Sequence, residues 1–184
     1  MVRLETPVCD FGQSAIDFSL PDVDGKIWSL EECCGAKGLL VMFICNHCPY
    51  VKAIQQRLVN DTAELRELGI NSVAIMSNDP TQYAEDSPEN MKKIAAEFNF
   101  PFPYLLDAAQ VVAKKYGAVC TPDFFGYNAD LELQYRGRLD ASRKELIAGD
   151  MKRDLFDAMK QVSQTGHGPK DQIPSMGCSI KWID

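Results

Sequence analysis

The feature that most constrains the fold of this chain is an apolar run that leads directly into a pair of cysteines. Residues 39–44 are all apolar, which is typical of a strand buried on both faces of a sheet. Cys45-Asn46-His47-Cys48 follows at once, and an apolar stripe of helical period covers residues 49–68. The chain therefore places two thiols between a central strand and the N-terminus of a helix, which favours an α/β fold.

Periodicity elsewhere predicts the other elements. Alternating residues 16–20 and 26–30 flank Asp24-Gly25, a dipeptide typical of hairpin turns. Further strands are predicted at 70–76, 124–127 and 131–136, the last two around the turn Asn128-Ala129-Asp130. Further helices are predicted at 88–98, between Asp107 and Gly117, and over roughly 151–163.

The order of these elements predicts one mixed sheet. Helices that connect successive strands make right-handed crossovers, so the middle strands run parallel and the last hairpin adds an antiparallel edge. We expect a central mixed β-sheet flanked by helices, with an N-terminal β-hairpin and an irregular C-terminal tail. The length of 184 residues fits one domain at 14–166, between an N-terminal arm at 1–13 and the tail at 167–184. Because the tail ends in the apolar stretch Ile180-Lys181-Trp182, we expect it to pack back on the domain.

Composition excludes several classes of partner. The formal net charge is −7, and Lys and Arg form no run that would bind a phosphate backbone, so we expect neither nucleic acid nor an anionic membrane as partner. The longest apolar run, 39–45, is far shorter than the ~20 residues of a membrane helix. The first residues lack the apolar core of a signal peptide, so we expect a cytoplasmic protein. In that reducing compartment, paired cysteines more often serve catalysis or metal binding than scaffolding.

The spacing of Cys45 and Cys48 suits redox chemistry. Two thiols separated by two residues at a helix N-terminus can close a small disulfide. Unpaired N–H groups and the positive end of the helix dipole favour a thiolate, which is the nucleophile of disulfide exchange. We therefore expect a lowered pKa at Cys45, with a hydrogen bond or a charge supplied by His47.

Two other interpretations of the motif remain open. The cysteines could be small buried side chains, or they could be half of a zinc site. A structural zinc site needs four ligands, and the chain has no second Cys-x-x-Cys, so His47 and a distant Cys178 or His167 would have to complete it. We favour a redox centre that holds no metal and no cofactor.

The motif and the predicted architecture together resemble the thioredoxin-like superfamily, and within it a peroxiredoxin-like branch related to the alkyl hydroperoxide reductase and thiol-specific antioxidant family. The resemblance covers most of residues 14–184. The segments that carry it are Phe43-Ile44-Cys45-Asn46-His47-Cys48-Pro49-Tyr50-Val51, Tyr116-Gly117-Ala118-Val119-Cys120-Thr121-Pro122, Tyr135-Arg136-Gly137-Arg138-Leu139-Asp140 and Ser175-Met176-Gly177-Cys178-Ser179-Ile180-Lys181-Trp182.

The resemblance implies a thiol–disulfide oxidoreductase. Cys45 matches the cysteine that attacks a substrate disulfide, and Cys48 matches the resolving cysteine. Thr121 and Pro122 match the loop with a cis-proline that presents its backbone to substrate. The implied partners are protein or low-molecular-weight disulfides and an unidentified thiol reductant, and homodimerisation is left open. A histidine before the second cysteine also occurs in strongly oxidising members, so we expect a reduction potential above the about −270 mV of thioredoxin.

The same resemblance offers a second activity, a thiol peroxidase that uses Cys48. The chain departs from the peroxiredoxin pattern, because Cys45 stands where a threonine or serine is usual and Val41 where a proline is usual. The nearest candidates for an activating arginine are Arg136 and Arg138. A third alternative is a non-catalytic module that binds metal or acts as an adaptor.

Five cysteines lie outside the motif. Cys120 and Cys178 are candidate accessory thiols, because the first precedes the Thr121-Pro122 loop and the second lies in the tail that we expect to pack on the domain. Cys9, Cys33 and Cys34 are interpreted as structural or incidental.

Overall fold

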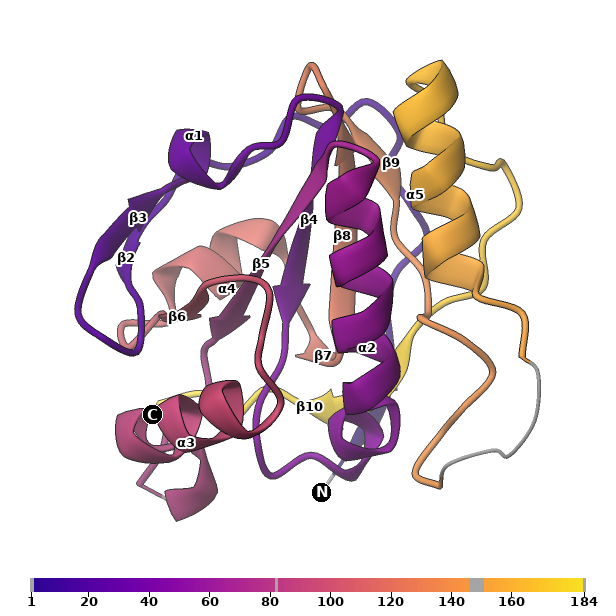
Figure 1. Ribbon diagram of the computed structural model, residues 1–184. Helices are drawn as coiled ribbons and strands as arrows, with labels where there is room; N and C mark the ends of the chain where they lie inside the picture. Colours follow the sequence, from indigo (N-terminus) through magenta and orange to yellow (C-terminus); the bar gives the residue numbers. More distant parts are fainter. Residues whose placement is uncertain (1, 82, 146–150, 184) are drawn as a thin grey trace.

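The computed structural model describes residues 2–81, 83–145 and 151–183 (Figure 1). Its central sheet contains five strands: β4 (Gly38–Phe43), β5 (Ile70–Met76), β6 (Tyr104–Leu106), β8 (Asp123–Asn128) and β9 (Leu133–Tyr135). β5 pairs with β6 in parallel, whereas β4, β8 and β9 pair antiparallel in that order. β4 and β5 run side by side in the same direction and join the two parts. The predicted mixed sheet is therefore confirmed.

Helices cover both faces of this sheet. They are α1 (Leu30–Cys33), α2 (Pro49–Glu67), α3 (Pro88–Glu97), α4 (Val111–Tyr116) and α5 (Asp154–Thr165), with a 3-10 turn, η1 (Ala84–Asp86), before α3. α2 and α5 lie together on one face and α4 on the other (Figure 1). Alternation along β4 explains the two layers, because Leu40 and Met42 pack toward α2 and α5 while Val41 and Phe43 pack toward α4.

The capping signals of the sequence act as expected. Ser87 caps α3 by accepting the N–H of Asn90, and Pro88 occupies the first turn. α2 ends at Glu67 and α4 ends before Gly117, which takes the left-handed conformation that terminates helices. The N-terminal hairpin is β2 (Ser19–Pro21) paired antiparallel with β3 (Ile27–Ser29).

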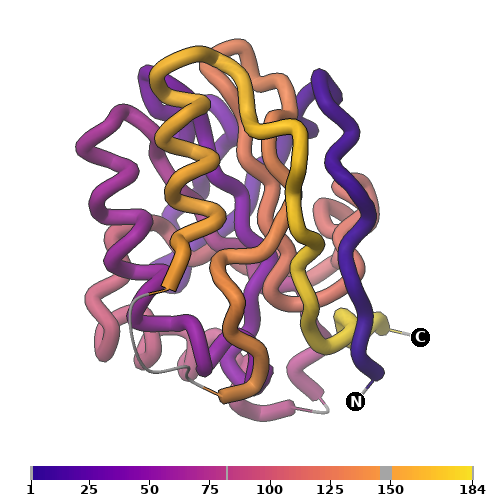
Figure 2. The backbone as a smooth tube through the Cα atoms, turned by 90° about the vertical axis from the view of Figure 1, so that its right-hand side faces the viewer, coloured from indigo at the N-terminus to yellow at the C-terminus, as the bar shows by residue number. Residues whose placement is uncertain are grey.

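The two ends of the chain form a further small sheet. β1 (Arg3–Glu5), β10 (Met176–Ser179) and β7 (Cys120–Thr121) pair antiparallel in the order β1-β10-β7. Figure 2 shows the N-terminal segment and the tail running side by side. The tail packs on the domain as expected, but part of the segment predicted to be irregular is the strand β10. Among the described residues, no helix combines the length and the apolar character that a membrane crossing requires.

Candidate active site

The motif occupies the connection from β4 to α2. Cys45 lies two residues beyond the end of β4, and Cys48 is the N-cap residue of α2, with Pro49 in the first turn. Cys45 is 1% exposed, Cys48 is fully buried and His47 is 7% exposed. The site is therefore closed to solvent in this conformation.

The loop between β7 and β8 faces both thiols. Its Thr121–Pro122 peptide bond is cis, as the resemblance implies. The Sγ of Cys45 lies 3.2 Å from the Oγ1 of Thr121, and the Sγ of Cys48 donates to the carbonyl oxygen of Thr121 at 3.1 Å. The structure thus brings together the motif and the loop that were predicted from distant segments.

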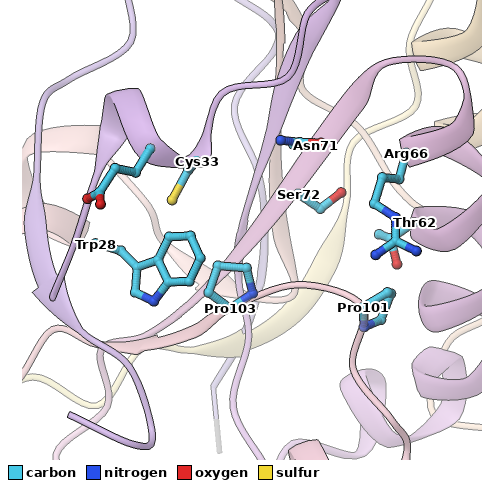
Figure 3. Close-up of a pocket in the computed structure, with 9 residues that line it drawn as sticks. Trp28, Cys33, Thr62, Arg66, Asn71, Ser72, Pro101 and Pro103 are labelled. Carbon is cyan, nitrogen blue, oxygen red and sulfur yellow. The ribbon is translucent and has the colours of Figure 1, made fainter. Parts of the chain in front are cut away.

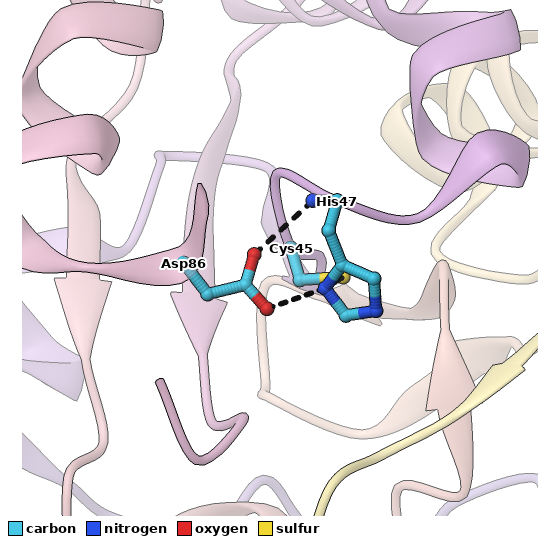
Figure 4. A group of neighbouring side chains, drawn as sticks. All are labelled: Cys45, His47 and Asp86. Atoms are coloured by element: carbon cyan, nitrogen blue, oxygen red, sulfur yellow. Dashed lines mark hydrogen bonds and ion pairs between the residues drawn. The ribbon is translucent and has the colours of Figure 1, made fainter. Parts of the chain in front are cut away.

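Asp86 is a central residue of the site that the sequence did not indicate. Its side chain is fully buried, and His47 donates from Nδ1 to its Oδ2 at 2.6 Å (Figure 4). The backbone N–H groups of Asn46 and His47 donate to its Oδ1 at 2.8 and 3.1 Å, and Asn78 donates to its Oδ2 at 2.9 Å. Burial opposes ionisation, but the hydrogen bonds from His47 and Asn78 outweigh it and hold the pKa of Asp86 below its usual range.

These contacts decide what His47 does. Because the Asp86 carboxylate is an acceptor, Nδ1 of His47 carries the proton, and the Sγ of Cys45 lies 3.6 Å from the same nitrogen. Asp86 accepts that single proton, so a Cys45 thiolate can only share the Nδ1–H with Asp86, and His47 cannot remove the Cys45 proton through Nδ1. Tyr83 stacks on the imidazole with ring centroids 4.0 Å apart and covers it from outside.

Cys45, His47 and Asp86 are also a set of metal-type ligands whose atoms lie within 4.8 Å of one another. Two ligands of one tetrahedral zinc ion lie about 3.3 Å apart, given metal–ligand distances near 2.0 Å. The 2.6 Å separation of His47 and Asp86 is instead that of a hydrogen bond, and Asp86 already accepts three further N–H donors. The arrangement fits a proton between the two side chains better than a metal ion.

The two motif thiols are not equivalent. Burial, the hydrogen bond with Cys48 and the nearby Asp86 carboxylate raise the pKa of Cys45 well above its usual range. The hydrogen bond from Cys45 lowers the pKa of Cys48 to about 5, and the N–H groups of Val51 and Cys178 add to this effect against the influence of burial. The expectation of a lowered pKa at Cys45 is therefore wrong for this closed, reduced conformation, because burial dominates at Cys45, whereas Cys48 at the helix N-cap has the hydrogen bonds that favour a thiolate.

The two candidate accessory thiols lie on neighbouring strands. Cys178 on β10 is opposite Thr121 on β7, is 3% exposed and lies close enough to Cys48 to lower the pKa of that thiol. Cys120 is fully buried and directs its Sγ toward the carbonyl oxygen of Pro122 at 3.6 Å. Cys178 therefore contacts the motif directly, whereas Cys120 makes its hydrogen bond to the loop.

The candidate arginines of a peroxidase are engaged away from the thiols. Arg136 binds the buried Asp123 at 3.0 Å and the carbonyl oxygen of Gly117 at 2.8 Å. Arg138 binds Asp154 at 2.7 Å. Neither guanidinium group hydrogen-bonds a motif thiol.

The pocket drawn in Figure 3 is separate from this centre. It has a volume of about 170 Å³ and lies between α1, α2, β5 and the segment before β6, with Trp28, Cys33, Arg66 and Ser72 among its lining residues. None of the residues predicted for the redox site lines it. Cys33 faces this pocket rather than the motif.

Comparisons with known proteins agree with the fold and the motif. The chain is similar to an uncharacterized conserved protein of Geobacillus kaustophilus at 44% identity and a TM-score of 0.93, with 100% of this chain and 97% of that chain covered. It is similar to a hypothetical protein of Sinorhizobium meliloti at 38% identity and a TM-score of 0.91, with 97% and 98% covered. The thioredoxin domain of a thiol-disulfide oxidoreductase from Bacteroides vulgatus shares the fold at 17% identity and a TM-score of 0.62, with 82% and 96% covered. The search of curated proteins found no match.

The match to a family is broader than the motif alone. The family described as the AhpC/TSA family matches residues 11–141, a range that contains both the cysteine motif and the Thr121-Pro122 loop. Together with the thioredoxin-like fold, this match confirms the resemblance to a peroxiredoxin-related branch of the thioredoxin-like superfamily. The chain belongs to the AhpC/TSA family.

Proposed function

We propose that this protein is a thiol–disulfide oxidoreductase whose redox centre is the Cys45–Cys48 pair. The observation that carries the proposal is the arrangement of both sulfurs against Thr121, with Cys45 3.2 Å from its hydroxyl and Cys48 3.1 Å from its carbonyl oxygen. A thioredoxin-like redox function fits the family, and disulfide exchange is the reaction that two neighbouring thiols can complete without an added cofactor.

In the reduced protein, Cys45 and Cys48 are suited to share one proton, so that one is a thiol and the other a thiolate. As a thiol, Cys48 donates to the carbonyl oxygen of Thr121, and once it is deprotonated it accepts the S–H of Cys45. When that proton moves to Cys48, the charge moves to Cys45, where the Nδ1–H of His47 and the hydroxyl of Thr121 are within hydrogen-bond reach. Each sulfur therefore has its own donors, and either can hold the charge.

The reaction proceeds in two exchanges. The Cys45 thiolate attacks one sulfur of a substrate disulfide, and the other substrate sulfur leaves as a thiolate that takes up the proton held by Cys48. The Cys48 thiolate then attacks Cys45 in the mixed disulfide, so the second substrate sulfur leaves as a thiolate and the Cys45–Cys48 disulfide forms. In a reducing compartment such as the cytoplasm, a thiol reductant would restore the pair. Protein and low-molecular-weight disulfides are the proposed substrates.

Because both thiols are buried, substrate must be admitted by a local opening. Tyr83 on His47 and the end of the tail at Lys181 are the segments to move, since the N–H of Lys181 donates to Asn78 at 2.9 Å and its carbonyl oxygen accepts from Asp79 at 2.8 Å. Such openings draw on segments of low local stability, and both of these residues lie outside the helices and strands.

Trapping of mixed disulfides tests the proposal. With Cys48→Ser, the second exchange is blocked, so Cys45 should accumulate disulfide-linked partners from cell extract. The reduced variant should also form a stable mixed disulfide when it is mixed with a model disulfide. Cys45→Ser should trap none through position 45, and Cys33→Ser, which changes an equally buried thiol outside the site, should behave as wild type. Absence of trapping in Cys48→Ser, with no disulfide exchange by the wild type, would refute the proposal.

One observation favours a second candidate, a thiol peroxidase. The lowered pKa of Cys48, about 5, makes it a thiolate at neutral pH. In this reaction the thiolate attacks a peroxide oxygen, Cys48 becomes a sulfenic acid and water or an alcohol leaves. Cys45 then condenses with the sulfenic acid and releases water. Rapid peroxide consumption, with a sulfenic acid trapped on Cys48 in Cys45→Ser, would favour this activity over disulfide exchange.

A further inference from the structure

Three thiols meet at the N-terminus of α2, and the third lies outside the motif. Cys48 hydrogen-bonds the carbonyl oxygen of Thr121, the residue opposite Cys178 on the neighbouring strand, and both Cys45 and Cys178 lower the pKa of Cys48. All three side chains belong to the same core cluster and none is more than 3% exposed. Cys178 is therefore placed to react with the sulfur of Cys48.

The position of Cys178 is fixed from both edges of its strand. β10 is the middle strand of its sheet, with Arg3 opposite Cys178 on one side and Thr121 opposite it on the other. Thr121 is also the residue whose carbonyl oxygen lies 3.1 Å from the Sγ of Cys48. One residue thus sets the spacing between Cys48 and Cys178.

The neighbours of Cys178 are adapted to hold the strand against the cis-proline loop. A Cβ on Gly177 would lie 2.0 Å from the carbonyl oxygen of Thr121, so only glycine permits this approach. Ser175 donates its hydroxyl to the carbonyl oxygen of Pro122 at 2.8 Å, and its N–H donates to the hydroxyl of Thr6. Close backbone packing and hydrogen bonds therefore hold the tail strand against the cis-proline loop of the redox site.

We propose that Cys178 is a third redox thiol, which exchanges the Cys45–Cys48 disulfide for a Cys48–Cys178 disulfide. In this step the sulfur of Cys178 attacks the Sγ of Cys48 and gives up its proton as the new bond forms. The Cys45–Cys48 bond breaks, Cys45 leaves with its electron pair, and it takes up the proton that Cys178 lost. One disulfide is present before and after, so the step needs no external oxidant or reductant.

The three sulfurs would then have different roles, an inference that rests on the proposed disulfide exchange at the motif. Cys45, which attacks the substrate, returns to the thiol state. The disulfide then joins Cys48 at the start of α2 to Cys178 on β10. Cys120 does not offer the same route, because its sulfur is directed to the Pro122 carbonyl.

Peptide mapping of the oxidised protein tests this inference. The full chain is oxidised in glutathione buffers, quenched with acid, alkylated and digested with trypsin. Cys45 and Cys48 fall in the peptide of residues 38–52, and Cys178 falls in the peptide of residues 171–181. We expect a cross-link between these two peptides in the wild type, and we expect it to become the main oxidised species in Cys45→Ser.

Two double variants provide the controls. Cys45→Ser combined with Cys178→Ser should lose the cross-link and carry glutathione on Cys48. Cys45→Ser combined with Cys33→Ser should keep the cross-link, since Cys33 is as buried as Cys178 but contacts a different pocket. Glutathione on Cys48 without a cross-link in a folded Cys45→Ser protein would overturn the inference. If that variant does not fold, absence of the cross-link from the oxidised wild type overturns it instead.

The same samples separate this inference from the proposed function. Disulfide exchange by the wild type without the cross-link would overturn the role of Cys178 and leave the function in place. The cross-link without disulfide exchange on protein substrates would support the role of Cys178 and overturn the function.

Discussion

Removal of the Cys45 thiol should raise the pKa of Cys48 by about one to two units. In the structure the largest influence on Cys48 is the hydrogen bond from Cys45, and with the other donors it sets the pKa at about 5. A hydrogen bond to a charged group contributes about 1.5–3 kcal/mol, and one pKa unit corresponds to about 1.36 kcal/mol. The Cys45→Ala variant should therefore titrate at Cys48 near about pH 6–7, so that the thiolate fraction at about pH 6 falls from nine-tenths to one-half or less.

Ultraviolet absorbance of the thiolate, measured against pH, reports this change with little interference. Burial raises the pKa of every cysteine outside the motif, so these thiols stay protonated below about pH 8. They are Cys9, Cys33, Cys34, Cys120 and Cys178. A transition at low pH in the wild type is therefore assigned to the motif.

Two controls make the result decisive. Cys48→Ser should abolish the transition, and Cys33→Ser should leave it in place. Burial opposes the Cys48 thiolate, and so does the carbonyl oxygen of Thr121, which accepts the proton of the neutral thiol. If the transition survives Cys48→Ser and is lost in Cys45→Ala, the thiolate belongs to Cys45 and the placement of charge given above is refuted.

Three further predictions follow from the same contacts. A thiolate stabilised in the reduced pair makes the motif disulfide oxidising, so its potential in glutathione buffers should lie above about −270 mV, and a lower value would contradict this. Asp86→Asn should destabilise the protein by about 2–4 kcal/mol in denaturant titration, because it removes a buried, charge-assisted acceptor. Since the pKa of Asp86 is lowered by folding, its contribution is present above about pH 3.9 and is lost as the pH falls through the folded value, so the deficit of the variant should shrink in acid. Gly177→Ala should destabilise by about 2 kcal/mol or more because its Cβ would collide with Thr121, whereas Ser179→Ala on the same strand should change the midpoint by less than about 0.5 kcal/mol.

Elements with a strong local pattern could be predicted from the sequence. β5 was expected at 70–76 and lies at Ile70–Met76, because seven residues in succession fill the centre of the sheet. α2 was expected at 49–68 and lies at Pro49–Glu67, because its proline start, apolar stripe and terminal glycine all agree. In each case the residues that define the element are its own.

Short strands could not be predicted in this way. β1, β7 and β10 contain three, two and four residues, and each is a strand only because another segment lies beside it. The pairing of Arg3 with Cys178 joins the two ends of the chain, and no local periodicity reports it. The tail was therefore expected to pack on the domain, with Cys178 as a candidate accessory thiol, but its strand was not expected.

The thiolate was expected at Cys45 and is instead favoured at Cys48, and this error also comes from contacts between distant segments. The helix N-terminus was rightly expected to favour a thiolate, but that effect acts at the N-cap, which is Cys48. Cys45, three residues earlier, lies instead near Asp86, a buried carboxylate that only the path from β5 through η1 brings to the motif. The sequence offers nothing to distinguish Asp86, which is buried at the motif, from the adjacent Glu85, which reaches the motif through its backbone carbonyl oxygen. A Cys-x-x-Cys pattern at a strand–helix junction thus fixes where the redox pair lies, while burial and the hydrogen bonds of each sulfur determine which of the two holds the charge.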